Sequence, residues 1–140
     1  MSDSTAVPKP APEPVTQLDE EFWEQCAQKG LCFQRCSACD TWRHLPRSMC
    51  AQCGSTDWEW AKSSGRGHVY SWSISHQAMH PAFANDVPYA VLIVELEEGV
   101  RMVSGLRELP PDQLELGLPV EAFFEDDGEN PPVPWFRPRT

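Results

Sequence analysis

Two pairs of cysteines carry the most specific chemical signal in the sequence. Cys36-Ser-Ala-Cys39 is followed, after ten intervening residues, by Cys50-Ala-Gln-Cys53. Two such motifs suit a tetrahedral zinc ion held by four thiolates at about 2.3 Å. Four cysteine ligands leave no position on the metal for a substrate or an activated water, so the predicted site is structural. Iron in the same cage would give a rubredoxin-like electron carrier, which would absorb visible light as zinc does not.

The other reactive side chains form no recognisable catalytic set. Cys26 and Cys32 lie outside the pairs, and we expect a buried small side chain at the first and an ordinary free thiol at the second. His76 and His80, followed by Asp86, are the best acid–base candidates, but no nucleophile elbow, zinc-protease motif or nucleotide-binding glycine loop accompanies them. The sequence therefore favours a protein without an active site of its own.

Five basic residues lie in or beside the cysteine-rich segment of a chain that is otherwise acidic, with 21 Asp and Glu against 11 Lys and Arg. Two interpretations are equally supported. The cations could hold the phosphates of an anionic cofactor such as coenzyme A, or they could balance the negative charge of a zinc tetrathiolate. The five residues are Arg35, Arg43, Arg47, Lys62 and Arg66.

Charge and hydropathy narrow the class of protein further. Between Glu95 and Glu129 there are eleven acidic residues and only Arg101 and Arg107, a balance that would repel a phosphate backbone and so disfavours nucleic acid as the main partner. No basic, apolar leader opens the sequence, and the longest nearly apolar run, residues 87–94, is too short to span a membrane. We expect a cytoplasmic protein without membrane association, in which cysteines bind metal rather than form disulfides.

The first part of the chain divides into a tail and a helix. Residues 1–15 carry prolines at positions 8, 10, 12 and 14 and are expected to be disordered. Residues 16–31 are expected to form an amphipathic helix, with Thr16 as its N-cap and Gly30 just past its end. Its apolar face repeats every four residues, at Leu18, Phe22 and Cys26.

The rest of the chain is expected to be mainly β. Residues 32–62 form a zinc ribbon that closes in a strand at Trp58–Trp60, and residues 63–140 hold four or five short strands of a small barrel or sandwich. The expected strands are 68–76, 89–94, 100–106 and 120–125, with 131–137 as an edge strand. In the first of them Tyr70, Trp72 and Ile74 are expected on one face, and Glu97 and Glu98 are expected to be solvated residues of a hairpin turn.

Over about residues 18 to 138 the chain resembles the zinc-ribbon plus OB-fold family associated with acyl-CoA enzymes. Two positions depart from the family's pattern, because Asp40 stands where such knuckles commonly have glycine and Leu45 replaces an aromatic residue. The resemblance is carried by Phe22-Trp23, Arg35-Cys36-Ser-Ala-Cys39, Leu45-Pro46-Arg47, Cys50-Ala-Gln-Cys53-Gly54, Gly65-Arg66-Gly67-His68-Val69-Tyr70-Ser71, Pro88-Tyr89, Val94-Glu95-Leu96 with Gly99, Gly117-Leu-Pro119-Val120 and Phe136-Arg137-Pro138.

This resemblance implies an N-terminal helix, a rubredoxin-like zinc ribbon and then a five-stranded OB-fold barrel. It also implies a role as a non-catalytic subunit that docks on and stabilises a thiolase-superfamily enzyme, either a thiolase or a lipid-transfer-protein-like aldolase. Such a subunit would help to form the acyl-CoA site of a hetero-oligomer, in pathways of lipid metabolism such as steroid or aromatic degradation. Trp23, Trp135 and Phe136 of this chain are candidate residues for contact with such a partner.

Two alternatives from other classes stay open at this point. One is the rubredoxin-like electron carrier. The other is a stand-alone OB-fold module that binds single-stranded nucleic acid by stacking bases on Tyr70 and Trp72.

Overall fold

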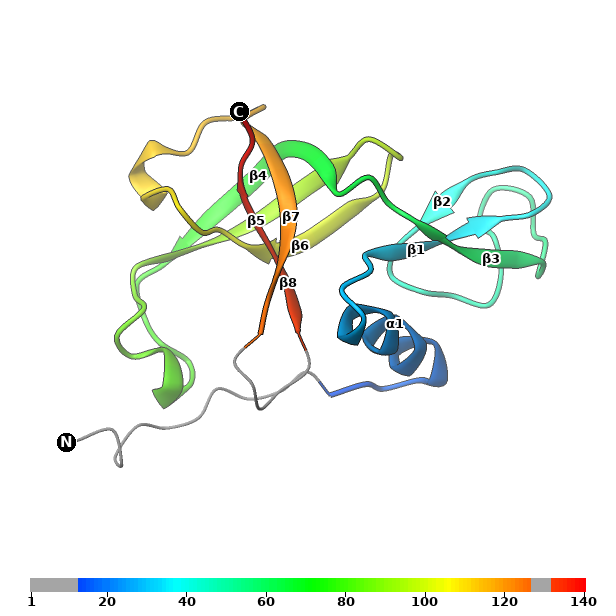
Figure 1. Ribbon diagram of the computed structural model, residues 1–140, viewed down its shortest axis with the longest axis horizontal. Coiled ribbons are helices and arrows are strands. Elements are labelled where there is room, and N and C mark those ends of the chain that lie inside the picture. Colours follow the sequence, from blue (N-terminus) through cyan, green and yellow to red (C-terminus); the bar gives the residue numbers. More distant parts are fainter. Residues whose placement is uncertain (1–12, 127–131) are drawn as a thin grey trace.

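A computed structural model describes residues 13–126 and 132–140, and these residues form mainly β structure with one α-helix, as expected. The expected disorder of residues 1–15 falls for the most part on residues 1–12, outside the described residues. Figure 1 shows the helix and a small sheet beside a larger curled sheet. The elements are α1 (Gln17–Ala27), β1 (Cys32–Cys36), β2 (Trp42–Arg43), β3 (Trp58–Lys62), β4 (Arg66–Ser75), η2 (Pro81–Phe83), β5 (Tyr89–Leu96), β6 (Arg101–Gly105), η3 (Pro111–Gln113), β7 (Pro119–Glu125) and β8 (Val133–Pro138).

Helix α1 begins where the sequence predicts. Thr16 and Asp19 form a capping box, in which each side chain accepts a hydrogen bond of 3.2 Å from the other residue's backbone N–H. The helix ends at Ala27, so the left-handed position past its end falls on Lys29, with φ of 61°, and not on Gly30. The N–H of Gly30 then donates to the carbonyl of Gln25 at 2.9 Å, which completes a Schellman motif.

The zinc-ribbon segment forms a three-stranded antiparallel sheet in the order β2-β1-β3. The predicted strand at Trp58–Trp60 is part of β3, whose Trp58 lies opposite Cys36. The two turns that carry the cysteine pairs extend from this sheet.

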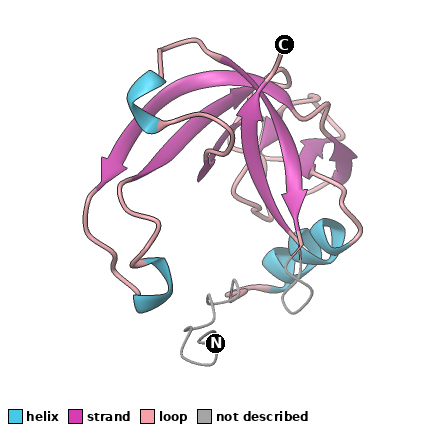
Figure 2. Ribbon diagram, turned by 60° about the vertical axis from the view of Figure 1, so that its left-hand side comes forward, coloured by secondary structure: helices cyan, strands magenta, loops and turns pink. Residues whose placement is uncertain are grey.

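The larger sheet has the order β6-β5-β4-β7-β8, with every neighbouring pair antiparallel. Gly99, with φ of 94°, forms the predicted hairpin turn between β5 and β6, and β8 is the predicted edge strand. The sheet curls strongly (Figure 2). A parallel bridge between Leu106, just after β6, and Phe136 of β8 joins its two edges. Five strands in this partly closed arrangement form an OB-fold barrel, as expected.

A β-bulge in β4 corrects the predicted face of one aromatic residue. Val69 pairs with Val94 and Ser71 pairs with Ile93, so Tyr70 is the extra residue between them. Val69 is buried while Tyr70 is 45% exposed. Because the bulge shifts the alternation of side chains, Trp72 beyond it packs against the core. The expectation that Tyr70 and Trp72 share a face is therefore wrong.

One hydrophobic core joins the helix, the ribbon and the barrel. Phe22 and Cys26 of α1 belong to the same buried cluster as Phe33 of β1 and the inner side chains of the barrel. Phe136 of β8 is fully buried in this cluster, so it is a core residue and not the exposed contact residue that the sequence suggested. The other buried members are Leu31, Val69, Ala90, Leu92, Val94, Leu96, Val100, Met102, Leu106, Leu114 and Val120.

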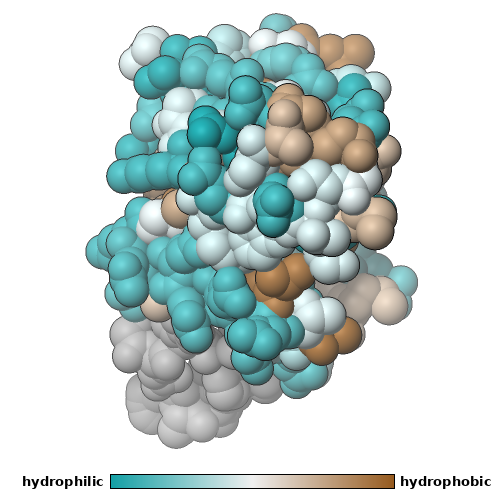
Figure 3. Space-filling model, turned by 90° about the vertical axis from the view of Figure 1, so that its right-hand side faces the viewer, coloured by the Kyte–Doolittle hydropathy of each residue, from teal (hydrophilic) through white to brown (hydrophobic). Residues whose placement is uncertain are grey.

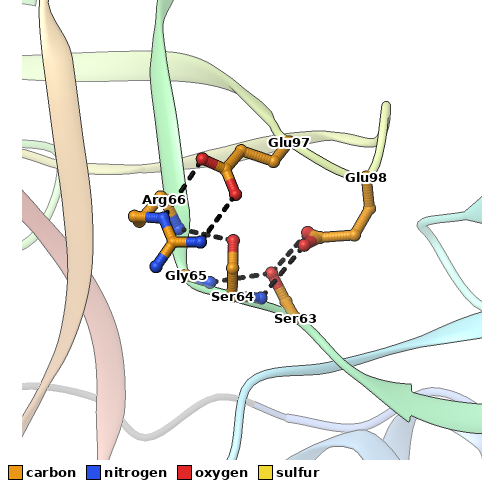
Figure 4. Close-up of polar contacts among 6 residues, drawn as sticks. All are labelled: Ser63, Ser64, Gly65, Arg66, Glu97 and Glu98. Carbon is orange, nitrogen blue, oxygen red and sulfur yellow. Dashed lines mark hydrogen bonds and ion pairs between the residues drawn. The ribbon is translucent and has the colours of Figure 1, made fainter.

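The linker between ribbon and barrel is also held by polar contacts (Figure 4). The Ser63 hydroxyl donates to one oxygen of Glu98 at 2.6 Å, and the N–H of Ser64 donates to the other at 3.0 Å. Arg66 donates twice to Glu97, at 3.0 and 3.1 Å, which lowers the pKa of that carboxyl. Glu97 and Glu98, expected only to be solvated, thus fasten the linker to the β5–β6 turn.

The packing at Gly67 generates a stability prediction. A Cβ atom there would lie 2.4 Å from the carbonyl oxygen of Glu95 on the neighbouring strand, and backbone cannot move as a side chain can. We expect Gly67→Ala to lower the free energy of unfolding by about 1–3 kcal/mol, measured by urea denaturation. Gly30→Ala is the control, since its Cβ would meet atoms only at 3.6 Å and beyond. Equal stability of the two variants would contradict this account of the strand contact.

Candidate metal centre and partner-binding surfaces

The two cysteine pairs lie in turns of the same construction. In the first turn the N–H of Asp40 donates to the carbonyl of Cys36 at 2.9 Å, and in the second the N–H of Gly54 donates to the carbonyl of Cys50 at 2.9 Å. Asp40 and Gly54 both adopt left-handed backbone, with φ of 63° and 77°. Asp40 therefore takes up the conformation that glycine usually supplies, at the modest steric cost that Asp tolerates.

The four sulfur atoms converge on one point. All lie within 4.8 Å of one another, and pairs from opposite turns are 3.6 Å apart for Cys36 and Cys53 and 3.7 Å apart for Cys39 and Cys50. A regular tetrahedron with metal–sulfur bonds of about 2.3 Å has edges of about 3.8 Å. The spacing therefore fits one tetrahedral ion with four sulfur ligands.

The protonation of these thiols also favours a cation. Hydrogen bonds from backbone N–H groups of their own turns lower the pKa of Cys36 and of Cys50, and the hydroxyl of Thr41 lowers the pKa of Cys39. At Cys53 a backbone N–H lowers the pKa, but the sulfurs of Cys36 and Cys39 outweigh it and raise the pKa to about 12. Positive charge between the sulfurs would remove this last proton, because it stabilises the thiolate.

The two remaining cysteines have the environments that the sequence suggested. Cys26 is fully buried, and burial, together with the neighbouring Cys32, raises its pKa to about 12. Partial burial also raises the pKa of Cys32. Neither thiol is activated as a nucleophile.

His44 is a partly buried histidine that sequence reasoning did not single out, because it belongs to no motif or periodic pattern. Its ring lies between those of Phe22 and Phe33, with centroid distances of 5.2 and 5.1 Å. Burial lowers its pKa to about 4, against a smaller opposing effect of Asp19. A neutral His44 is thus part of the core between helix and ribbon.

The structure gives one of the two predicted histidines a structural role. The Nδ1 atom of His80 accepts a hydrogen bond of 3.0 Å from the N–H of Ala82 and so caps the short helix η2. This contact supports the loop between β4 and β5.

The five basic residues predicted to bind phosphate do not converge on one site. Arg35 donates to Glu59 at 2.6 Å on the ribbon sheet, and Arg66 binds Glu97 at the linker. Lys62 lies at the end of β3. These positions favour charge balance within the protein for Arg35 and Arg66.

Arg43 and Arg47 are the two that the structure brings together. Both line a pocket of about 260 Å³ between the ribbon and the barrel, which reaches Gly99 and Val100 of the barrel's hairpin turn. Sequence reasoning could not select this pair, because the barrel residues lie more than fifty positions further along the chain.

A second, more apolar pocket of about 230 Å³ lies at the end of the barrel, where Phe83, Tyr89 and Val103 are among its lining residues. Trp135 forms one wall, and Arg107 stacks on its ring at 3.6 Å. Of the three residues predicted to contact a partner, Trp135 thus lines a pocket. Trp23 instead packs edge to face on Phe22 at 5.3 Å and lies against the core.

The ribbon side of the molecule is mostly hydrophilic, with separate hydrophobic patches (Figure 3). Leu45 and Met49, which follow β2, are 64% and 55% exposed. Within residues 13–126 and 132–140, no helix is long and apolar enough to cross a membrane.

Comparison with known proteins recognises the same two modules. Residues 23–59 match the family described as "ChsH2, rubredoxin-like zinc ribbon domain", and residues 60–125 match "ChsH2, C-terminal OB-fold domain". The class is therefore that of proteins in which a zinc ribbon precedes an OB-fold.

The chain belongs to the DUF35 family. It is 36% identical over 100 residues to a "DUF35 domain-containing scaffold protein" of Methanocaldococcus jannaschii, an alignment that covers 69% of this chain and 70% of the relative. It is 42% identical over 128 residues to a "Probable enoyl-CoA hydratase alpha subunit" of Thermomonospora curvata. That alignment covers 91% of this chain but only 40% of the relative's length.

A solved structure described as "Ltp2-ChsH2(DUF35) aldolase" contains a chain of the same fold. The TM-score is 0.83 at 38% identity, and the match covers 91% of this chain and 98% of that chain.

The sulfur cluster generates a metal prediction. We expect the purified protein to contain one zinc ion per chain by elemental analysis and to show no visible absorbance. Cys50→Ser should lose the metal, because three thiolates hold zinc far less tightly than four. Cys32→Ser is the matched control and should keep it, since Cys32 lies outside the cluster. Iron in the wild type, or equal metal loss in both variants, would contradict the assignment.

His44 generates a pH prediction. Its folded pKa of about 4 lies below the ordinary 6.5, so between these values the unfolded chain binds a proton that the folded one does not. The stability that neutral His44 contributes is present above about pH 6.5 and is lost as the pH falls toward 4. When the pH is lowered from about 7.5 to 5, the free energy of unfolding should fall in the wild type. In His44→Phe it should fall by about 1–2 kcal/mol less, because that variant has no imidazole to protonate. Parallel pH profiles from urea denaturation would rule this out.

Proposed function

We propose that this protein is a non-catalytic accessory subunit that docks on and stabilises a thiolase-superfamily enzyme acting on acyl-CoA. The enzyme is a thiolase or a lipid-transfer-protein-like aldolase, and the two form a hetero-oligomer in the cytoplasm. The observation that carries the proposal is the likeness to a chain in the "Ltp2-ChsH2(DUF35) aldolase" structure, which this chain covers almost completely.

The names of the relatives support the same role. One is called a scaffold protein, and another is called a subunit of an enoyl-CoA hydratase. A scaffold role suits the described residues as well, because four cysteine ligands leave no position for chemistry on a metal and His44 is partly buried with a pKa lowered to about 4.

In this proposal Cys36, Cys39, Cys50 and Cys53 hold one structural zinc ion. The ion would supply a cross-link between two turns that are separated by ten residues, and four thiolates would close its coordination sphere. The two turns carry their own hydrogen-bonded backbone, so the chain is prepared to present all four sulfurs together.

A contribution to coenzyme A binding by Arg35, Arg43, Arg47, Lys62 and Arg66 stays a prediction. The ion pairs of Arg35 and Arg66 with glutamates favour the charge-balance interpretation for those two residues. The docking role does not depend on this contact.

The nucleic-acid alternative is weakened by the β4 bulge. A stacking platform needs neighbouring aromatic faces that are open to bases. Tyr70 and Trp72 lie on opposite faces of the sheet, and Arg101 already stacks on Tyr70 at 3.8 Å.

The proposal is tested by isolating the tagged protein from its own host and identifying, by quantitative mass spectrometry, what accompanies it. We expect a thiolase-superfamily protein in nearly stoichiometric amount, whereas the tag alone should recover none. The control variant Cys32→Ser, which should keep its zinc, should recover as much of that enzyme as the wild type does. Recovery of the protein alone, with its zinc, would mean that the fold is right and the role is wrong.

A further inference from the structure

Residues 41–52, which we call the ribbon loop, form a basic surface segment next to the barrel. The ribbon loop contains Arg43 and Arg47 and no Asp or Glu, although the whole chain has a net charge of −10. It lines the pocket of about 260 Å³ that ends at Gly99 and Val100. Such a local reversal of charge complements an acidic surface.

Buried hydrogen-bond donors in this region lack acceptors. The Oε1 atom of Gln34 accepts from Arg43 Nε at 2.8 Å and from the N–H of Arg47 at 2.7 Å, which fixes the orientation of an amide that is 1% exposed. Among the residues that the structure describes, neither Gln34 Nε2 nor Arg43 Nη1 has an acceptor, and both atoms are buried. Both donors therefore lie beneath the surface, and the exposed donor at the pocket is the guanidinium of Arg47.

The guanidinium of Arg43 is held in place by hydrogen bonds within the protein. Its Nη2 atom donates to the carbonyl of Arg47 at 2.7 Å, and its Nε atom is bound to Gln34. Two of its three nitrogens are therefore occupied within the protein and the third, Nη1, is buried, so Arg43 offers a fixed positive charge at the pocket. A guanidinium fixed in this way loses little conformational entropy on binding.

Apolar side chains flank the two arginines. Leu45 and Met49 line the same pocket and are 64% and 55% exposed. Arginine beside methionine and other apolar residues is typical of protein interfaces, where apolar contacts exclude water from a charged pair. A phosphate ester would use the two cations but would leave these flanks uncovered.

We propose that the ribbon loop docks an acidic segment of the partner enzyme. One Asp or Glu carboxylate of that segment accepts hydrogen bonds from the exposed Arg47 guanidinium, beside the fixed positive charge of Arg43, and its apolar neighbours cover Leu45 and Met49. This assignment rests on the proposed function, since it names the surface by which the subunit holds its enzyme.

The first test compares recovery of the partner from host extract by three tagged variants. We expect Arg47→Glu and Leu45→Ser to lower recovery about tenfold or more, because one reverses the charge and the other removes apolar area. Arg139→Glu makes the same change of charge outside the ribbon loop and should recover the partner as the wild type does. Full recovery by Arg47→Glu would overturn the docking surface and leave the proposed function standing.

A second test does not need the partner. The probe is a capped peptide of alternating Leu and Glu, compared with its Leu and Gln counterpart and with coenzyme A, while amide resonances of the ribbon loop are followed by NMR. We expect shifts with the Glu peptide alone and none in Arg47→Glu. If the wild-type protein recovers no enzyme from extract but binds the Glu peptide, the proposed enzyme partner is wrong, while the assignment of the ribbon loop to an acidic segment stands. Binding of coenzyme A in place of the peptide would overturn the site's assignment to a protein.

Discussion

The convergence of four cysteine sulfurs is the constraint on which the rest of the ribbon depends. Sulfurs less than 4 Å apart across the two turns repel one another once they ionise, and hydrogen bonds with the sulfurs of Cys36 and Cys39 raise the pKa of Cys53 to about 12. The ribbon has three short strands and contributes few side chains to the buried cluster, so apolar burial alone holds it weakly. A cation between the sulfurs would convert their repulsion into a cross-link. The position of the ribbon loop, with Cys50 at the wall of its pocket, follows from that point.

The ribbon and the barrel are joined as one body through two different kinds of contact. Helix α1 places Phe22 in the cluster that also contains Phe33 of the ribbon and Phe136 of the barrel, while Glu98 binds the linker at Ser63. Apolar contacts and hydrogen bonds thus act on opposite sides of the junction. As a result, the ribbon loop and the barrel residues that line the pocket between the modules have a defined orientation to one another.

Features of this molecule that depend on local spacing could be predicted from the sequence. The capping box at Thr16, the two cysteine turns, the hairpin at Gly99 and the edge strand near the C-terminal end each involve residues close together in the chain. The features that the sequence did not predict depend on contacts with residues that are distant in the chain. The bulge at Tyr70 arises from pairing with β5, and the burial of His44 requires helix α1.

The candidate site divides in the same way. The four cysteines could be selected because their spacing alone defines a metal site, and the structure brings their sulfurs together. The basic residues could not be sorted, since the glutamate that binds Arg66 and the turn that faces Arg43 lie elsewhere in the chain. Phe136 was misjudged for the same reason, because an aromatic residue near a chain end carries no sign of the strand on which it packs.

The bridge between Leu106 and Phe136 has a consequence for biosynthesis. Contacts of the ribbon sheet close within residues 32–62, so that module can form early as the chain leaves the ribosome. The barrel cannot, because β8 supplies both the pairing of β7 and a core phenylalanine. Until residues 133–138 emerge, β7 offers an unpaired edge to any neighbouring nascent chain. A protein that bound the chain during synthesis would meet a ribbon already folded and a barrel just closing.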